Sequence, residues 1–158
     1  MTTPTSISLP SGSQERFRSI VDVHVILRRD DGRVLLLERG AGRYGAGQLH
    51  LPSGHLEKSE SLDQGAAREA WEETGVHIDP VHLDMVALIH HRQDADHTRI
   101  GVFFASEQWS GQPHNREPDK CAELYWADPT DLPASTIDYP AAGIRAWATQ
   151  TRYTAHGW

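Results

Sequence analysis

One short segment of the chain concentrates acidic side chains at helical spacing. The seventeen residues from Glu57 to Glu73 carry six carboxylates against two cations. Glu69, Glu72 and Glu73 lie at i, i+3 and i+4, so in a helix they would share an arc of about 100°. Like charges placed this close repel one another. They require either full solvation or a bound hard cation such as Mg²⁺, which prefers carboxylate oxygens.

The helix that carries these acids has recognisable ends. Ser61 and Gln64 have the spacing of a capping box, and Gly75 stands where a left-handed residue would end the helix. An inward stripe is predicted near its start, at Leu62, Ala66 and Ala70. Glu69 and Glu73 fall within about 20° of that direction, so the buried face changes from apolar to acidic. Because inward carboxylates without partners would be forced towards their neutral form, a bound cation is favoured over a solvated face.

The whole chain has the composition of an ordinary folded domain. Its 158 residues are 38% hydrophobic and 23% charged, which suits one domain with a proper core. The formal charge of −7 argues against a nucleic-acid polymer as partner but allows a small phosphorylated ligand whose charge metal ions neutralise. A single cysteine, Cys121, excludes an internal disulfide and fits a reducing cytosol. With no apolar run near 20 residues and no recognisable signal peptide, we expect a cytoplasmic protein without a membrane segment.

Alternating apolar residues predict a mixed sheet packed by helices. Residues 1–18 are rich in Ser, Thr and Pro and are expected to form a flexible leader, followed by a single domain over residues 19–158. The predicted strands cover residues 19–27, 34–37, 81–89, 100–105 and 124–127, and a second helix covers residues 141–149. The step Asp31-Gly32 between the first two strands predicts a hairpin. The aromatic residues expected to fill the core are Phe103, Phe104, Tyr125 and Trp126.

Three other patterns carry weaker signals. Gly40, Gly42 and Gly45 match Gly-x-Gly-x-x-Gly, but the residues that follow lack the helix that a dinucleotide site requires. Ten histidines suggest a metal centre, above all over residues 90–97, yet no pair has the i, i+4 spacing of a zinc site, and a polar loop is favoured. No Gly-x-Ser-x-Gly elbow is present to anchor a hydrolytic triad.

The acidic helix, by contrast, belongs to a long motif. Five residues separate Gly54 from Glu60, seven separate Glu60 from Arg68, and the chain continues Arg-Glu-Ala-Trp-Glu-Glu-Thr-Gly-Val. Every fixed position of the Nudix box, Gly-x5-Glu-x7-Arg-Glu-U-x-Glu-Glu-x-Gly-U, is filled. Only Ala70, at the first U position, is smaller than the usual aliphatic residue. Over residues 51–76 the chain therefore resembles the Nudix hydrolases.

The resemblance implies a fold, a cofactor and a set of residue roles. It implies an α/β/α sandwich with a central mixed sheet, in which the box binds Mg²⁺ or Mn²⁺ and a nucleoside diphosphate linked to another group is cleaved. The implied metal ligands are the side chains of Glu69, Glu72 and Glu73 and the backbone carbonyl of Ser53. The positions implied to support the box are Gly54, Glu60 and Gly75. Arg68 would orient Glu69, and both belong with Glu73 to the implied catalytic group.

Residues outside the box are also candidates for the site. Glu117, in the loop before the last predicted strand, lies about where some family members have a metal ligand or general base, with Asp119 as the alternative. Either Glu69 or Glu117 could accept the proton of the attacking water. Arg92 and Arg99 flank a predicted strand and are candidate contacts for substrate phosphate.

Within the family, the chain looks most like the nucleoside triphosphate pyrophosphohydrolases of the MutT type. A Glu-Pro-Asp-Lys-Cys segment followed by a Trp-containing strand adds to the box in this respect. The alternatives are a pyrophosphatase of ADP-ribose or nucleotide sugars, and a non-catalytic nucleotide-sensing module. Because degenerate relatives tend to lose a box glutamate and this chain has all of them, an enzyme is favoured. Homodimers are common among such chains, so a homodimer is a further expectation.

Overall fold

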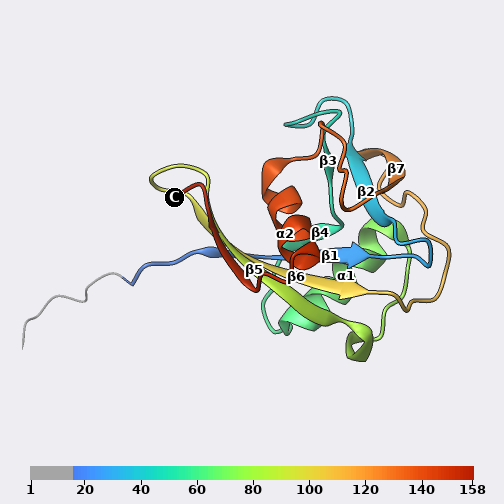
Figure 1. Cartoon of the computed structure of the whole chain (residues 1–158), viewed down its shortest axis with the longest axis horizontal. Helices are drawn as coiled ribbons and strands as arrows, with labels where there is room; N and C mark the ends of the chain where they lie inside the picture. Colours follow the sequence, from blue (N-terminus) through green and yellow to red (C-terminus); the bar gives the residue numbers. More distant parts are fainter. Residues whose placement is uncertain (1–15) are drawn as a thin grey trace, which may run out of the picture.

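The computed structural model describes residues 16–158, and most of the predicted leader over residues 1–18 lies outside them. Two sheets and two α-helices form the structure (Figure 1). The five-stranded sheet contains, in spatial order, β4 (Ser53–His55), β1 (Ile20–Leu27), β6 (Thr98–Ser106), β5 (Asp84–Arg92) and β8 (Tyr153–His156). The three-stranded sheet contains β3 (Leu49–His50), β2 (Val34–Arg39) and β7 (Cys121–Ala127). The helices are α1 (Leu62–Thr74), α2 (Asp138–Ala148) and the short 3₁₀ helix η1 (Pro80–His82).

The two α-helices pack on opposite faces of the five-stranded sheet. On one face, Ala66 and Ala70 of α1 join a buried cluster with Val23 and Val25 of β1. On the other face, residues of α2 join a second buried cluster with Ile26 of β1. Successive residues of a strand point to opposite faces, so β1 is buried on both sides. With parallel and antiparallel pairs in one sheet, this confirms the α/β/α sandwich around a mixed sheet.

Helix α1 has the predicted ends. The N–H of Ser61 donates to Oε1 of Gln64 over 3.0 Å, as a capping box requires. Gly75 adopts a left-handed φ of 73° and its N–H donates to the carbonyl of Trp71. The predicted inward stripe was partly wrong, because Leu62 in the first turn is 37% exposed. Of the helices within residues 16–158, none has the length and apolar character that crossing a membrane requires.

The predicted hairpin between β1 and β2 was wrong, although the turn itself exists. Gly32 has a left-handed φ of 85° in that turn. Beyond a single bridge from Arg28 to Val34, however, the two strands separate into different sheets. Both edges of β1 are already occupied, by β4 on one side and β6 on the other. The hydrogen-bonding groups of β2 therefore pair with β3 and β7.

Several predicted boundaries also shift. The strand expected from residue 81 starts at Asp84, because the Asp79 side chain caps Val81 in η1. Helix α2 starts at Asp138 and contains Pro140 in its first turn, where a missing N–H breaks no helical bond. Strand β8 has no counterpart in the prediction, and it adds the end of the chain to β5 in parallel register.

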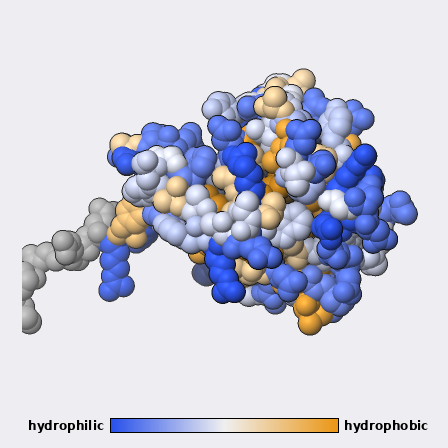
Figure 2. Space-filling model, viewed as in Figure 1, coloured by the Kyte–Doolittle hydropathy of each residue, from blue (hydrophilic) through white to orange (hydrophobic). Residues whose placement is uncertain are grey.

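Of the four aromatic residues expected in the core, two are buried there, Trp126 is partly buried against it, and one is exposed. Phe103 and Phe104 are buried, whereas Tyr125 is 37% exposed and donates to Glu38 and Glu123. The molecular face seen in Figure 2 is covered mainly by hydrophilic side chains, in keeping with the net charge of −7.

Candidate active site

The acidic part of α1 lies directly against β4. The N–H of Ser53 donates to Oε2 of Glu73 over 2.9 Å. A Cβ placed on Gly54 would lie 2.0 Å from Oε1 of Glu69, so only glycine leaves room for that carboxylate. Two carboxylates, one turn of helix apart, therefore reach the same two residues of β4.

Arg68 is the cation that compensates this group. Its Nε and Nη2 donate to the two carboxylate oxygens of Glu60 over 2.9 and 2.8 Å. Its Nη1 donates to Glu69 over 2.6 Å and to Glu72 over 3.2 Å. A planar guanidinium suits these simultaneous contacts, and they include the contact to Glu69 that an orienting role requires.

Burial raises the proton affinity of the two inward carboxylates. The pKa of Glu73 is raised to about 8, mainly by burial. The negative charges of Glu69 and Glu117 contribute to this rise, and the hydrogen bond from the Ser53 N–H opposes it. Burial also raises the pKa of Glu69, while Arg68 opposes that rise. Holding both side chains ionised therefore costs free energy, which a bound cation would recover.

The loop before β7 carries Glu117 and is fastened to the end of α1. The N–H of Arg116 donates to the carbonyl of Glu73 over 3.3 Å. The guanidinium of Arg116 lies 4.0 Å from the ring centroid of Trp71 and donates to the Trp71 carbonyl over 2.9 Å. The Glu117 carboxylate accepts from Nζ of Lys120 over 2.6 Å. The loop thus holds Glu117 beside the box.

The donors at the box suit a hard divalent cation. Glu69, Glu72 and Glu73 and the Ser53 carbonyl offer oxygen atoms alone, the ligands that Mg²⁺ and Mn²⁺ prefer. Across residues 16–158, no three His, Cys, Asp or Glu side chains already converge closely enough to hold an ion. Glu69 instead faces Arg68 and Glu73 faces the Ser53 N–H, so binding would require these carboxylates to turn towards the ion.

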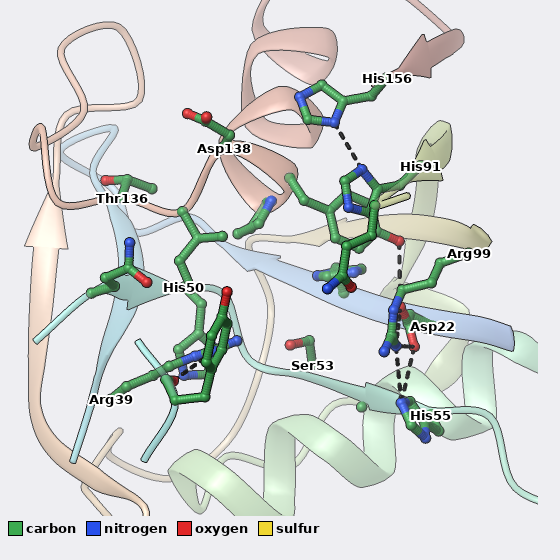
Figure 3. A pocket seen from close by; sticks show the side chains of 18 of the residues that line it. Asp22, Arg39, His50, Ser53, His55, His91, Arg99, Thr136, Asp138 and His156 are labelled. Atoms are coloured by element: carbon green, nitrogen blue, oxygen red, sulfur yellow. Dashed lines mark hydrogen bonds and ion pairs between the residues drawn. The ribbon is translucent and has the colours of Figure 1, made fainter. Parts of the chain in front are cut away.

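A cavity of about 920 Å³ opens beside the box, a volume within the range of small-molecule sites (Figure 3). Ser53 and Gly54 line its edge, so the cavity and the acidic group share these two residues. The rest of the wall comes from β1, the end of β2 and the loop that follows it, β3, β5, β6, β8 and the segment that leads into α2. Residues from seven strands and a helix N-terminus therefore face one space.

The two arginines proposed as phosphate contacts lie in different places. Arg99 lines the cavity, where its Nη1 donates to both carboxylate oxygens of Asp22 over 3.2 Å (Figure 3). Arg92 is absent from that wall. Its guanidinium lies 5.2 Å from the ring centroid of Trp158, and its Nε donates to the carbonyl of Asp94. The geometry brings Arg99, and not Arg92, to the candidate site.

Sequence reasoning missed the histidines of the cavity. Figure 3 shows His50, His55, His91 and His156 around it, and His24 also lines it. Asp22 and His24 alternate with the valines of β1, and such alternation predicts a strand with one buried and one solvent-facing side. Both are only 5% exposed, because α2 covers this face of the sheet and its Tyr139 contacts both side chains. Asp22 and His24, polar residues on the second face of β1, were the sequence feature that could have indicated this part of the cavity wall.

Comparisons with known proteins agree with the box and the fold. The family model of the NUDIX domain matches residues 18–148. Phosphatase NudJ of Escherichia coli K12 is 34% identical over 130 residues, which cover 78% of this chain and 80% of NudJ. An 8-oxo-dGTP diphosphatase of the same organism is 27% identical over 110 residues, which cover 68% of this chain and 83% of the relative. The crystal structure of the MutT Nudix hydrolase of Burkholderia pseudomallei superposes with a TM-score of 0.73 at 25% identity, over 82% of this chain and 98% of that one.

The α/β/α fold with an acidic box on α1 defines a hydrolase that acts on phosphoric anhydrides. The chain belongs to the Nudix family and is MutT-like within it.

Proposed function

We propose that this chain hydrolyses nucleoside triphosphates to nucleoside monophosphates and diphosphate, in a reaction that requires Mg²⁺ or Mn²⁺. The observation that carries the proposal is the edge that the acidic group and the cavity share. Ser53 and Gly54 line the cavity, while the Glu73 carboxylate accepts from the Ser53 N–H and the Glu69 carboxylate lies against Gly54. A substrate lying across this edge has its phosphates at the box and its nucleoside in the cavity.

The metal would be held by Glu69, Glu72, Glu73 and the Ser53 carbonyl. Bound there, it would supply positive charge to the diphosphate oxygens and acidify the attacking water. Arg68 keeps the Glu69 carboxylate in position through their 2.6 Å contact. Together these groups would draw a polyanionic substrate to a protein that is itself acidic.

We propose that Glu117 acts as the general base and accepts the proton of the attacking water. Glu69, the other candidate base, is committed to Arg68. Glu117 makes its contact with Lys120, a flexible side chain in the same loop. Its charge is close enough to raise the pKa of both Glu69 and Glu73, so it lies near the reacting groups.

The choice of nucleoside triphosphates rests on the cavity and on the relatives. Its volume of about 920 Å³ accommodates a nucleoside, and Arg99 stands in its wall as a cation. The similarity to a protein named 8-oxo-dGTP diphosphatase supports a triphosphate as substrate.

The experiment is a turnover assay on a panel of substrates, with and without Mg²⁺. The panel contains nucleoside triphosphates, dinucleoside polyphosphates, ADP-ribose and nucleotide sugars, and the products are separated by chromatography. Release of diphosphate from a nucleoside triphosphate, only when the metal is present, is the expected result. Cleavage of ADP-ribose or of a nucleotide sugar in preference would overturn the assignment of substrate but keep the reaction class. Binding of nucleotides without turnover of any would instead indicate the sensing module.

A further inference from the structure

Two buried polar side chains in the wall of the cavity lack a protein partner. In the part of the chain that the structure describes, the buried side-chain atoms without a hydrogen bond belong to His24, His90 and Thr136. His24 and Thr136 both line the cavity beside the box, and they are only 5% and 9% exposed. Buried polar groups normally have partners, because leaving them unpaired is costly. Two such groups in one cavity wall point to a ligand that supplies the missing hydrogen bonds.

The ring of His24 is fixed, while both of its nitrogens are buried without a hydrogen-bond partner. It stacks on Phe103 with ring centroids 4.3 Å apart and an interplanar angle of 4°. Tyr139 meets it edge to face at 5.1 Å. Burial, with added repulsion from His50 and Arg99, lowers the pKa of His24 to about 3. The imidazole is therefore neutral at pH 7 and offers one donor and one acceptor.

Thr136 is held by its backbone in a similar way. Its N–H donates to the Pro133 carbonyl over 2.9 Å. On either side of it, Leu49 accepts from the N–H of Ile137 over 2.9 Å and donates to the Ser135 carbonyl over 3.0 Å. The backbone groups around Thr136 are thus paired, and the hydroxyl is left as a donor and acceptor at a fixed position.

Three of the ionisable residues in the cavity wall, Asp22, Arg99 and His55, compensate one another. Figure 3 shows Asp22, Arg99 and His55 grouped on the opposite side of the cavity from Thr136. Arg99 bonds Asp22 over 3.2 Å, and Nε2 of His55 lies 3.1 Å from the same guanidinium nitrogen. The two unpartnered groups themselves, a neutral imidazole and a hydroxyl, offer uncharged hydrogen bonds, although Asp138 lines the wall near Thr136 and Asp22 lies two residues from His24. An uncharged group that both donates and accepts would match them.

We infer that His24 and Thr136 bind the base of the nucleotide substrate through hydrogen bonds and determine which base is accepted. This rests on the proposed function, since it takes the nucleoside into the cavity and leaves the phosphates at the box. A nucleobase edge carries neighbouring donors and acceptors on a flat, uncharged ring, which a sugar diphosphate without a base does not offer. The two residues act on binding and selection, while Glu69, Glu73 and Glu117 act on the diphosphate.

The test uses two variants that keep shape and remove hydrogen bonds, His24→Phe and Thr136→Val. Matched controls on exposed loops are His97→Phe and Thr130→Val, whose side chains contact Asp94 and Asp128 and do not line the cavity. For each protein, kcat and KM are measured with ATP, GTP, CTP and UTP and with ribose 5-triphosphate, which has no base. Thermal unfolding verifies that each variant is folded. Thr136→Val is nearly isosteric and keeps the test valid if His24→Phe does not fold.

We expect the ratio of kcat/KM for the preferred nucleotide to that for ribose 5-triphosphate to fall about fivefold to tenfold in each variant, mainly through KM. The order of preference among the four bases should change as well, and neither control should alter it. An unchanged ratio, or an equal loss on both kinds of substrate, would overturn the inference. If the wild-type protein cleaves no nucleoside triphosphate, the proposed substrate fails separately. In that case the metal-free protein is titrated with the four nucleosides to test base binding directly. Nucleoside binding that is weaker in both variants would support the inference, and absence of binding to the wild type would overturn it.

Discussion

The backbone N–H of Ser53 donates to the Glu73 carboxylate over 2.9 Å, and this single bond joins the last turn of α1 to the edge of the cavity. It fixes the position of the box acid whose pKa burial raises to about 8. It also sets that acid beside the residue whose carbonyl the family resemblance makes a metal ligand. The same two residues would therefore connect folding of the box with the proposed binding of metal and substrate.

Glu73→Gln separates these two roles. The amide keeps an oxygen that can accept from the Ser53 N–H, so we expect the variant to fold. It removes a negative charge from the proposed metal site, and we expect turnover in Mg²⁺ to fall about a hundredfold or more. Steady-state kinetics at several Mg²⁺ concentrations measures the loss, with Glu107→Gln, an exposed change of equal charge, as control. Activity like that of the wild type would show that Glu73 is not a ligand.

Gly54→Ala tests the close approach of Glu69 to β4. The added Cβ would lie 2.0 Å from Oε1 and 2.2 Å from Cδ of Glu69, so the side chain must turn away. Because a flexible carboxylate can move, we expect a folded protein whose Glu69 no longer meets Arg68 as before. A displacement of about 1 Å can cost about a hundredfold in rate. Kinetics of Gly54→Ala is compared with Gly42→Ala in an exposed turn, where the Cβ would meet nothing within 4 Å and the φ of +80° strains only the local backbone. An equal effect in both variants would contradict this account.

Arg68→Lys keeps the charge and removes the planar fork. A lysine cannot hold both oxygens of Glu60 and also reach Glu69, as Arg68 does. We expect the free energy of unfolding to fall by about 1–3 kcal/mol and kcat to fall with it. Denaturant unfolding and kinetics of the same preparation measure both. Full activity in Arg68→Lys would mean that only the positive charge at this position is required.

The box was predictable from the sequence because its determinants are local. The capping pair Ser61 and Gln64, the terminal Gly75 and the spacing of the glutamates all lie within one helix and its flanks. The burial of Glu69 also followed from its angular position on the helix, and its 8% exposure agrees.

What could not be predicted depends on pairing between distant segments. Whether β2 joins β1 or β7 depends on which edges are free, which the Asp31-Gly32 turn does not reveal. Strand β8 has four residues and an exposed Tyr153, too short and irregular a pattern to indicate a strand. The cytoplasmic location and the homodimer stay predictions from the sequence.

Arg116→Gln tests whether the loop before β7 must be fastened to α1. The variant loses the contact with the Trp71 ring and the hydrogen bond to its carbonyl. An exposed cation–π contact contributes about 0.5–1 kcal/mol, so stability should change little. We expect kcat to fall more than KM rises, because Glu117 is less well held beside the diphosphate. Arg145→Gln, on the exposed side of α2, is the control, and equal kinetics in the two variants would exclude a positioning role for Arg116.

His24→Phe should change how stability depends on pH. Burial lowers the pKa of His24 from 6.5 to about 3, so below pH 6.5 the unfolded chain takes up a proton that the folded protein does not. The free energy of unfolding is therefore not reduced by His24 above pH 6.5, and it decreases as the pH falls from 6.5 towards 3. At pH 5 this loss is about 2 kcal/mol for the wild type relative to pH 7, and the phenylalanine variant lacks it. His50, whose pKa burial lowers to about 4, adds a similar slope to both proteins, so the difference between them isolates His24. Urea unfolding at pH 7 and pH 5 measures that difference, with His97→Phe as control. Parallel pH profiles in the wild type and His24→Phe would show that His24 is not held neutral in the fold.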